Sequence, residues 1–140
     1  MSGVASAAGY SGTPLAKKLG YKQDSRVLLI EPPRGYEALL HPLPVGLRFE
    51  VQPGPGVDVA HVFVTNKKEL ARILRVLRKA LRADAAVWVS WPKRSAKAST
   101  LVSENLIREV ALPLGFVDVK VCAVNEVWSG LKLVVRKELR

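Results

Sequence analysis

The pattern of apolar positions divides the chain into short strands separated by amphipathic helices. The clearest helical pattern covers residues 67–81, where leucine and isoleucine recur at three- and four-residue spacing and basic residues occupy the opposite side. Thr65 or Asn66 is the expected N-cap. A second amphipathic pattern covers residues 103–112. Both patterns predict helices that pack on a sheet through their apolar sides.

The remaining apolar segments predict strands. In chain order they cover residues 26–30, 47–51, 58–65, 85–91, 116–124 and 127–137. Several of these runs are apolar throughout, which is typical of strands buried on both faces of a parallel sheet. The last two alternate and are joined at Asn125 and Glu126, which predicts an antiparallel hairpin.

The order of these elements predicts one α/β domain over residues 13–140, preceded by a flexible segment over residues 1–12. Two shorter helices are expected at residues 13–20 and 35–40. In the first of these, Thr13 is the expected N-cap and Pro14 the first helical residue. The predicted architecture is an open, three-layer, mostly parallel, Rossmann-like sheet of about six strands that ends in an antiparallel hairpin.

The turn after the first strand is unusual for such a sheet. The strand runs into residues 31–35, which read Glu-Pro-Pro-Arg-Gly. Nucleotide-binding α/β proteins place glycines at this point, so that backbone N–H groups close around the ligand. Proline has no N–H and its φ is fixed. We therefore expect no glycine-type cradle here.

The order of elements over residues 59–137 resembles the second half of the class I S-adenosylmethionine (SAM)-dependent methyltransferase fold. That resemblance implies a glycine-rich turn for the cofactor, where this chain has Glu31 to Gly35 instead. It also implies a helix, a strand and a helix for which residues 51–58 leave no room. The chain is therefore interpreted as a shortened methyltransferase-like domain, and SAM is disfavoured as its cofactor.

Three segments look like those of a bacterial family of small proteins described only as a domain of unknown function. They are residues 10–20 (Tyr-Ser-Gly-Thr-Pro-Leu-Ala-Lys-Lys-Leu-Gly), 88–93 (Trp-Val-Ser-Trp-Pro-Lys) and 126–132 (Glu-Val-Trp-Ser-Gly-Leu-Lys). This resemblance implies no activity.

Residues that follow the strands are the candidates for ligand binding, because ligands of open parallel sheets sit outside the carboxyl ends of the strands. The set comprises Glu31, Arg34, Thr65, Trp91, Lys93 and Trp128. Glu31 would accept a hydrogen bond from a ribose or amine, Trp91 would stack on a planar group, and Lys93 would meet an anion. The alternative is structural: Glu31 pairs with a basic residue, the tryptophans pack on the sheet, and Lys93 is solvated.

Charge favours an anionic partner. The formal net charge is +10, from 22 basic and 12 acidic residues. Candidate contacts to nucleic acid or another anion are Lys17, Lys18, Lys68, Arg72, Arg75, Lys79, Arg82, Lys93, Arg94 and Lys97. The first two lie in the short helix that begins at Thr13, and Trp91 would add a stacking surface. The alternative is a solvated helix face with Glu69 and Asp84 as counter-charges.

The chain lacks the recognisable parts of several chemistries. His41, His61 and Cys122 have no ligand spacing that defines a metal site, so none is expected. His61 lies in an apolar strand and is expected to be a satisfied buried histidine, and Cys122 a small core side chain. No serine or cysteine sits in a known nucleophile motif, and no catalytic residue is assigned.

The sequence also predicts where the protein is located and whether it contacts a second copy of itself. No apolar run reaches the roughly 20 residues that a membrane span needs. The start of the chain has no basic and apolar leader, so a cytoplasmic location without membrane contact is expected. The last hairpin would present an open sheet edge to a second copy of the chain.

The predicted function is therefore a non-enzymatic binding or interaction domain. The first alternative is a nucleic-acid or nucleotide-binding protein that uses residues 67–82 and 91–97. The less favoured alternative is an active SAM-dependent methyltransferase.

Overall fold

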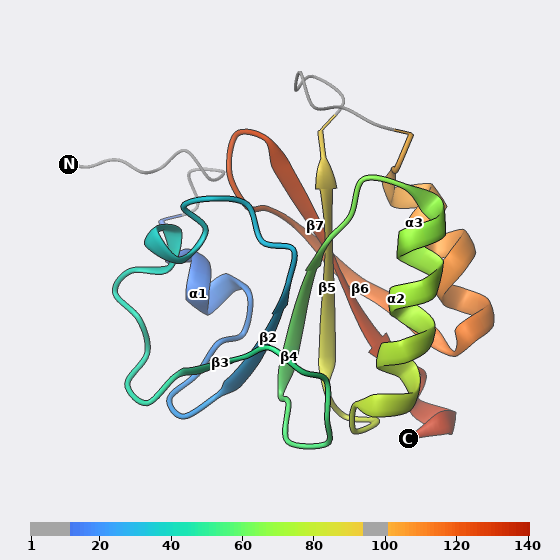
Figure 1. Ribbon diagram of the computed structural model, residues 1–140, viewed down its shortest axis with the longest axis horizontal. Helices are drawn as coiled ribbons and strands as arrows, with labels where there is room; N and C mark the ends of the chain where they lie inside the picture. Colours follow the sequence, from blue (N-terminus) through green and yellow to red (C-terminus); the bar gives the residue numbers. More distant parts are fainter. Residues whose placement is uncertain (1–11, 94–100) are drawn as a thin grey trace.

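The computed structural model describes residues 12–93 and 101–140, and these residues form a six-stranded sheet between two layers of helices (Figure 1). The strands are β2 (Arg26–Ile30), β3 (Arg48–Glu50), β4 (Val59–Phe63), β5 (Ala86–Pro92), β6 (Phe116–Ala123) and β7 (Trp128–Val135). The helices are α1 (Leu15–Lys18), α2 (Lys67–Ala80) and α3 (Glu104–Ala111), with 3-10 turns η1 (Glu37–Leu40), η2 (Leu112–Leu114) and η3 (Lys137–Leu139).

The sheet has the order β3-β2-β4-β5-β7-β6. Strands β3, β2, β4 and β5 are parallel, and β7 is antiparallel to both of its neighbours. Because the parallel strands all point the same way, the ends of β2, β4 and β5 lie together at one edge, which we call the carboxyl edge. The predicted fold class is confirmed, including the hairpin at the end of the chain.

Helices α2 and α3 cover one face of the sheet, which we call the α2 face (Figure 1). Leu70, Leu74 and Leu77 turn from α2 into an apolar core that includes Val62 and Val89 of the sheet. As expected, Asn66 caps α2 through its side chain, which accepts a hydrogen bond from the N–H of Glu69 at 2.8 Å. The helical periodicity alone was enough to predict which side of α2 is buried.

The opposite face, which we call the α1 face, is covered by much shorter elements. Leu15 of α1, Leu19 directly after it and Leu40 of η1 pack there with Tyr21 and Tyr36. The indole N–H of Trp88 in β5 donates to the carbonyl of Leu19 at 2.9 Å. This bond fixes the end of α1 to the middle of the sheet.

Arginine supplies the cation of each of six ion pairs between described residues. At the amino ends of the strands, Arg26 pairs with Glu50, and Arg82 at the end of α2 pairs with Asp58 and Asp84. The pKa of Asp58 is lowered, first by the backbone N–H of Arg26 and then by Arg82. These pairs lie where the chain passes from β3 to β4 without a helix.

The first helix is shorter than predicted. It begins at Leu15 rather than Pro14, and its N-cap is Pro14 rather than Thr13, with no side-chain cap bond. Pro14 has an extended ψ of 143°, so the prediction that it is the first helical residue is wrong. Gly20 follows the helix at a φ of 83°, a conformation that favours glycine. Within residues 12–93 and 101–140 no helix has both the length and the apolar character needed to cross a membrane.

Candidate functional site

The turn after β2 forms one wall of the carboxyl edge. Glu31 has a φ of 56° and Gly35 a φ of 82°, so the chain bends sharply on both sides of Pro32 and Pro33. The N–H of Tyr36 donates to the carbonyl of Pro33 at 3.1 Å and is used within the turn. With two imino acids in the bend, few backbone donors are left for a ligand. The turn also leads into the four-residue 3-10 helix η1 rather than into an α-helix.

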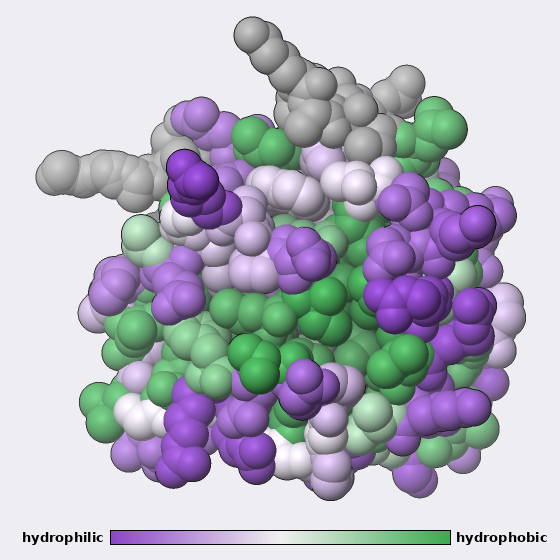
Figure 2. Space-filling model, viewed as in Figure 1, coloured by the Kyte–Doolittle hydropathy of each residue, from purple (hydrophilic) through white to green (hydrophobic). Residues whose placement is uncertain are grey.

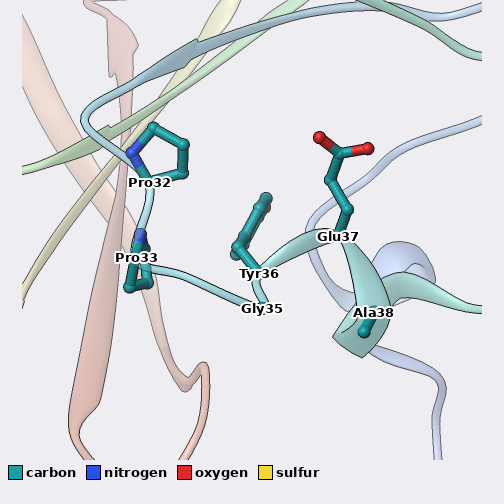
Figure 3. A pocket seen from close by; sticks show the side chains of 6 residues that line it. All are labelled: Pro32, Pro33, Gly35, Tyr36, Glu37 and Ala38. Atoms are coloured by element: carbon teal, nitrogen blue, oxygen red, sulfur yellow. The ribbon is translucent and has the colours of Figure 1, made fainter.

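The outer side of this turn carries a small pocket (Figure 3). Its volume is about 150 Å³, and it is lined by Pro32, Pro33, Gly35, Tyr36, Glu37 and Ala38. In the close view, Pro32 and Glu37 lie on opposite sides, with Tyr36 between them. Small-molecule sites usually measure roughly 300 to 1,000 Å³. This pocket therefore accommodates a fragment of a cofactor at most.

Aromatic rings fill the carboxyl edge on the α1 face. Phe63, the last residue of β4, makes edge-to-face contacts with Tyr36 and with Trp128, both at centroid distances of 5.2 Å. Trp128 begins β7 opposite Pro92, the last residue of β5. We call Tyr36, Phe63 and Trp128 the aromatic cluster. Its rings come from the ends of three neighbouring segments and close the position where an open sheet usually has its crevice.

Below the aromatic cluster lies a buried chain of hydrogen bonds, which we call the buried network. His61 Nε2 lies 2.7 Å from the Ser90 hydroxyl, and His61 Nδ1 lies 2.7 Å from the Tyr36 hydroxyl. The Tyr36 hydroxyl in turn lies 2.6 Å from that of Tyr21. All four side chains are buried, and the described residues contain no buried side-chain polar atom without a partner. The network therefore satisfies the polar groups that the α1 face encloses.

Burial controls the protonation of this network. It lowers the pKa of His61 to about 3, so the imidazole is neutral near pH 7. Burial also raises the pKa of Tyr36 and of Tyr21, which keeps both phenols protonated. Ser90 and His61 have the atoms of a nucleophile and its base, but both are 0% exposed and no substrate can reach them. The expectation of a satisfied buried histidine at position 61 is confirmed.

Gly130 of β7 is required by this packing. A Cβ at that position would lie 3.0 Å from the Ser90 hydroxyl and 3.3 Å from a ring carbon of Trp88. Such contacts are too close for an alanine without a shift of the neighbours. The backbone of β7 therefore passes close to Ser90 and Trp88 at Gly130.

The predicted ligand-binding residues do not converge on one crevice. Glu31, Arg34 and Thr65 are exposed near the carboxyl edge. Trp91 is only 7% exposed and packs in the core of the α2 face, as the structural alternative describes, and its ring is not available for stacking in this structure. Trp128 packs on the opposite face. The two tryptophans therefore cannot contact the same molecule.

Lys93 has a structural partner. Its ammonium group donates to the carbonyl of Asn125 at 2.7 Å, and its backbone N–H donates to Val127 at 2.7 Å. Both bonds tie the end of β5 to the turn of the hairpin. The sequence-based alternative of a solvated Lys93 did not include these contacts.

The predicted anion contacts fall into three groups. Lys17 and Lys18 lie in α1, whose four residues are too few to provide a helix N-terminal site. On α2, Arg72 pairs with Glu69, and beyond it Arg82 pairs with two aspartates. Lys68, Arg75 and Lys79 are exposed on α2 and make no ion pair with any described residue. Arg94 and Lys97 lie outside the described residues.

Metal binding has no support in the part of the chain that the structure describes. No group of three or more histidine, cysteine, aspartate or glutamate side chains there is arranged to hold an ion. Cys122 is half-buried, and burial raises the pKa of its thiol.

Comparisons with known proteins bear on the fold. The chain matches no protein-family model and no curated protein by sequence. It does match solved structures of methyltransferases. The mitomycin 7-O-methyltransferase MmcR is 15% identical with a TM-score of 0.61, over 79% of this chain and 49% of that one. A putative type 11 methyltransferase from Sulfolobus solfataricus is 12% identical with a TM-score of 0.61, over 88% and 90%.

The fold is methyltransferase-like. Aeropyrum pernix fibrillarin, solved with natively bound SAM, agrees at 14% identity and a TM-score of 0.58, over 90% of this chain and 70% of that one. Identities this low establish the fold and no activity. The chain spans about half the length of MmcR. The resemblance to a domain of unknown function stays a prediction.

Sequence reasoning missed the buried network. Its members come from four separated positions, and only His61 stood out as a polar residue in an apolar strand. Tyr21 and Tyr36 lie in turns, where the pattern of apolar residues assigns no face. A buried histidine needs hydrogen-bond partners, and the tyrosines in the flanking turns were the signal in the sequence that could have indicated them.

Proposed function

We propose that this protein is a binding domain that makes its contacts on its outer surface and does not transfer methyl groups. The observation that carries the proposal is the aromatic cluster of Tyr36, Phe63 and Trp128 at the carboxyl edge. Open parallel sheets hold their ligands at this edge. Here side chains of the protein itself occupy that position on the α1 face.

The residues after β2 also fit SAM poorly. The methyltransferase resemblance implies a glycine-rich turn whose N–H groups meet the cofactor, and Pro32 and Pro33 remove two such donors. The adjoining pocket of about 150 Å³ is half of the lower limit of roughly 300 Å³ for small-molecule sites. Both features favour a domain that does not enclose this cofactor.

The fold leaves room for a function other than methyl transfer. One matching structure is described as a pericyclic reaction enzyme, at 16% identity and a TM-score of 0.54. The structure of LepI in complex with SAM matches with a TM-score of 0.51. Proteins of this architecture therefore differ in the reactions that their descriptions name, and function has to be argued from each site.

Calorimetric titration with SAM and with S-adenosylhomocysteine tests the proposal. We expect no binding heat and no change of melting temperature in protein that melts cooperatively. Pro32→Gly/Pro33→Gly is the informative variant, since it restores the missing donors and leaves the aromatic cluster in place. This variant should also give no binding heat with SAM or S-adenosylhomocysteine. A micromolar dissociation constant for the wild type, or incorporation of a labelled methyl group into a substrate, would overturn the proposal and favour an active methyltransferase.

A second candidate function is nucleic-acid binding through α2. Lys68, Arg75 and Lys79 form a stripe that spans about 16 Å, since each helical residue rises about 1.5 Å. Hydrophilic residues gather over the side that α2 and α3 cover (Figure 2). The apolar side of α2 is used in the core, which leaves nothing for membrane insertion. Trp91 is buried, so contacts would be to phosphates rather than to bases.

Salt dependence decides this candidate. If all three cations contact phosphates, the logarithm of the affinity for duplex DNA should fall with the logarithm of salt at a slope of about −2.7. Lys68→Glu/Arg75→Glu/Lys79→Glu should abolish the binding in a fluorescence anisotropy titration. Absence of wild-type binding at low salt would remove this function.

A further inference from the structure

Three lysines gather on the α1 face of the hairpin with no acidic partner among the described residues. Lys120 of β6 lies directly across from Lys132 of β7 in the antiparallel register. Residues paired in this way have Cβ atoms about 5 Å apart, and like charges at such positions destabilise a sheet. Lys22, which follows α1 in the chain, adds a third positive charge that repels Lys132. We call Lys22, Lys120 and Lys132 the lysine cluster.

Both other lysines of the cluster act on the charge of Lys132. Its pKa is lowered, mainly by burial and further by repulsion from Lys120 and Lys22. Cys122 borders the cluster. Burial raises the pKa of this thiol, whereas Lys18 and Lys120 act to lower it. Several ammonium groups therefore surround a small area of the hairpin.

No described carboxylate neutralises this area. The ion pairs that the structure shows all use arginine. Asp118, two residues before Lys120, pairs with Arg108 of α3 on the α2 face. A bulge between Asp118 and Lys120 shifts the register of β6 at this point. The side chains of Asp118 and Lys120 therefore lie on different faces of the sheet.

Protection of a sheet edge explains only part of the cluster. Lysines on edge strands discourage pairing with other chains, and β6 is an edge strand. Lys132, however, belongs to β7, which lies between β5 and β6, and it is paired with the buried Trp88 on its other side. A half-buried lysine on an inner strand, opposite a second lysine, needs a different explanation.

We propose that Lys22, Lys120 and Lys132 bind a phosphate-bearing anion of at least two negative charges. Lysine ammonium groups bind phosphate as point charges, and an anion among them would replace mutual repulsion by attraction. The site goes beyond the function proposed above. It lies on the hairpin rather than at the carboxyl edge, so the SAM titration does not test it.

Inorganic pyrophosphate is the probe, at constant ionic strength adjusted with KCl. We expect the melting temperature of the wild type to rise with pyrophosphate. Lys132→Met should weaken the affinity about 10- to 100-fold, the effect of losing one hydrogen bond to a charged group. Lys120→Met/Lys132→Met should abolish the response. The matched control Lys137→Met removes one exposed lysine outside the lysine cluster and should respond like the wild type.

Two further measurements test the proposal without relying on the loss of the pyrophosphate response in the variants. Without any phosphate, Lys120→Met should melt at a higher temperature than the wild type, because it removes repulsion at an exposed position. Amide shifts during an NMR titration of the wild type should concentrate at Lys22, at residues 120–122 and at residues 130–132. The proposal is overturned by a wild type that ignores pyrophosphate, by a double variant that still responds, or by shifts that map to α2.

Discussion

The two faces of the sheet enclose different kinds of interior. On the α2 face, the fourteen-residue helix α2 supplies a row of leucines, and the core it forms with the sheet is made of apolar side chains. On the α1 face, the covering helices have four residues each. Tyrosines and a histidine complete that face, and their polar atoms are joined in the buried network.

This difference follows from the area that each element can cover. A long amphipathic helix brings many apolar side chains to a sheet without enclosing any polar group. Short helices leave gaps, and aromatic rings fill gaps with few side chains. Tyrosine carries a hydroxyl into the interior, however, and a buried hydroxyl needs a partner. The α1 face is therefore stabilised by fewer and more specific contacts.

The largest expected effect comes from the apolar face. Leu74→Ala removes a fully buried side chain and should lower the free energy of unfolding by about 2 to 5 kcal/mol. Val76→Ala, on the same helix but exposed, is the control and should change it little. Urea denaturation measures both. Equal losses would mean that the core of the α2 face is looser than the packing shows.

An effect of intermediate size comes from acid. Between about pH 6.5 and pH 3 the unfolded chain binds a proton at His61 and the folded chain does not, so stability falls as the pH falls. At pH 5 the loss should be about 2 kcal/mol.

The control for this effect is His61→Gln, which cannot titrate. Its free energy of unfolding, measured by urea denaturation at each pH, should lack this part of the slope. Carboxylates with lowered pKa values, such as Asp58, act in a lower pH range and are present in both proteins. Identical slopes in the two proteins would show that His61 is not shielded from protons.

The smallest expected effect comes from one hydroxyl of the buried network. Tyr36→Phe keeps the ring contacts with Phe63 and removes the bonds to Tyr21 and His61. The free energy of unfolding should fall by about 1 to 2 kcal/mol, less than for Leu74→Ala. Tyr21→Phe should cost less, since Tyr36 then keeps its 2.7 Å bond to His61, whereas Tyr36→Phe leaves only the longer 3.3 Å bond between Tyr21 and His61. The reverse order in urea denaturation would contradict the central place of Tyr36.

The sequence was sufficient to predict the α2 face and insufficient for the α1 face. The periodicity of residues 67–81 specified the buried side of the helix, and the order of runs specified the sheet. In β5, by contrast, apolar residues fill both faces. The separation of three residues places Trp88 and Trp91 on opposite sides of a strand, but the pattern did not show which side each one takes. Tyr21 and Tyr36 lie in turns, where no regular spacing of side chains indicates which residues are buried. Strand order therefore predicted where the carboxyl edge of the sheet lies, whereas the contacts made there were not predictable.

The division of labour between arginine and lysine has a chemical consequence. The six ion pairs between described residues use arginine guanidinium groups. Reagents or enzymes that acylate amines would therefore remove positive charge from the surface and spare each of those pairs. A structural bond that they would break is that of the Lys93 amine to the carbonyl of Asn125.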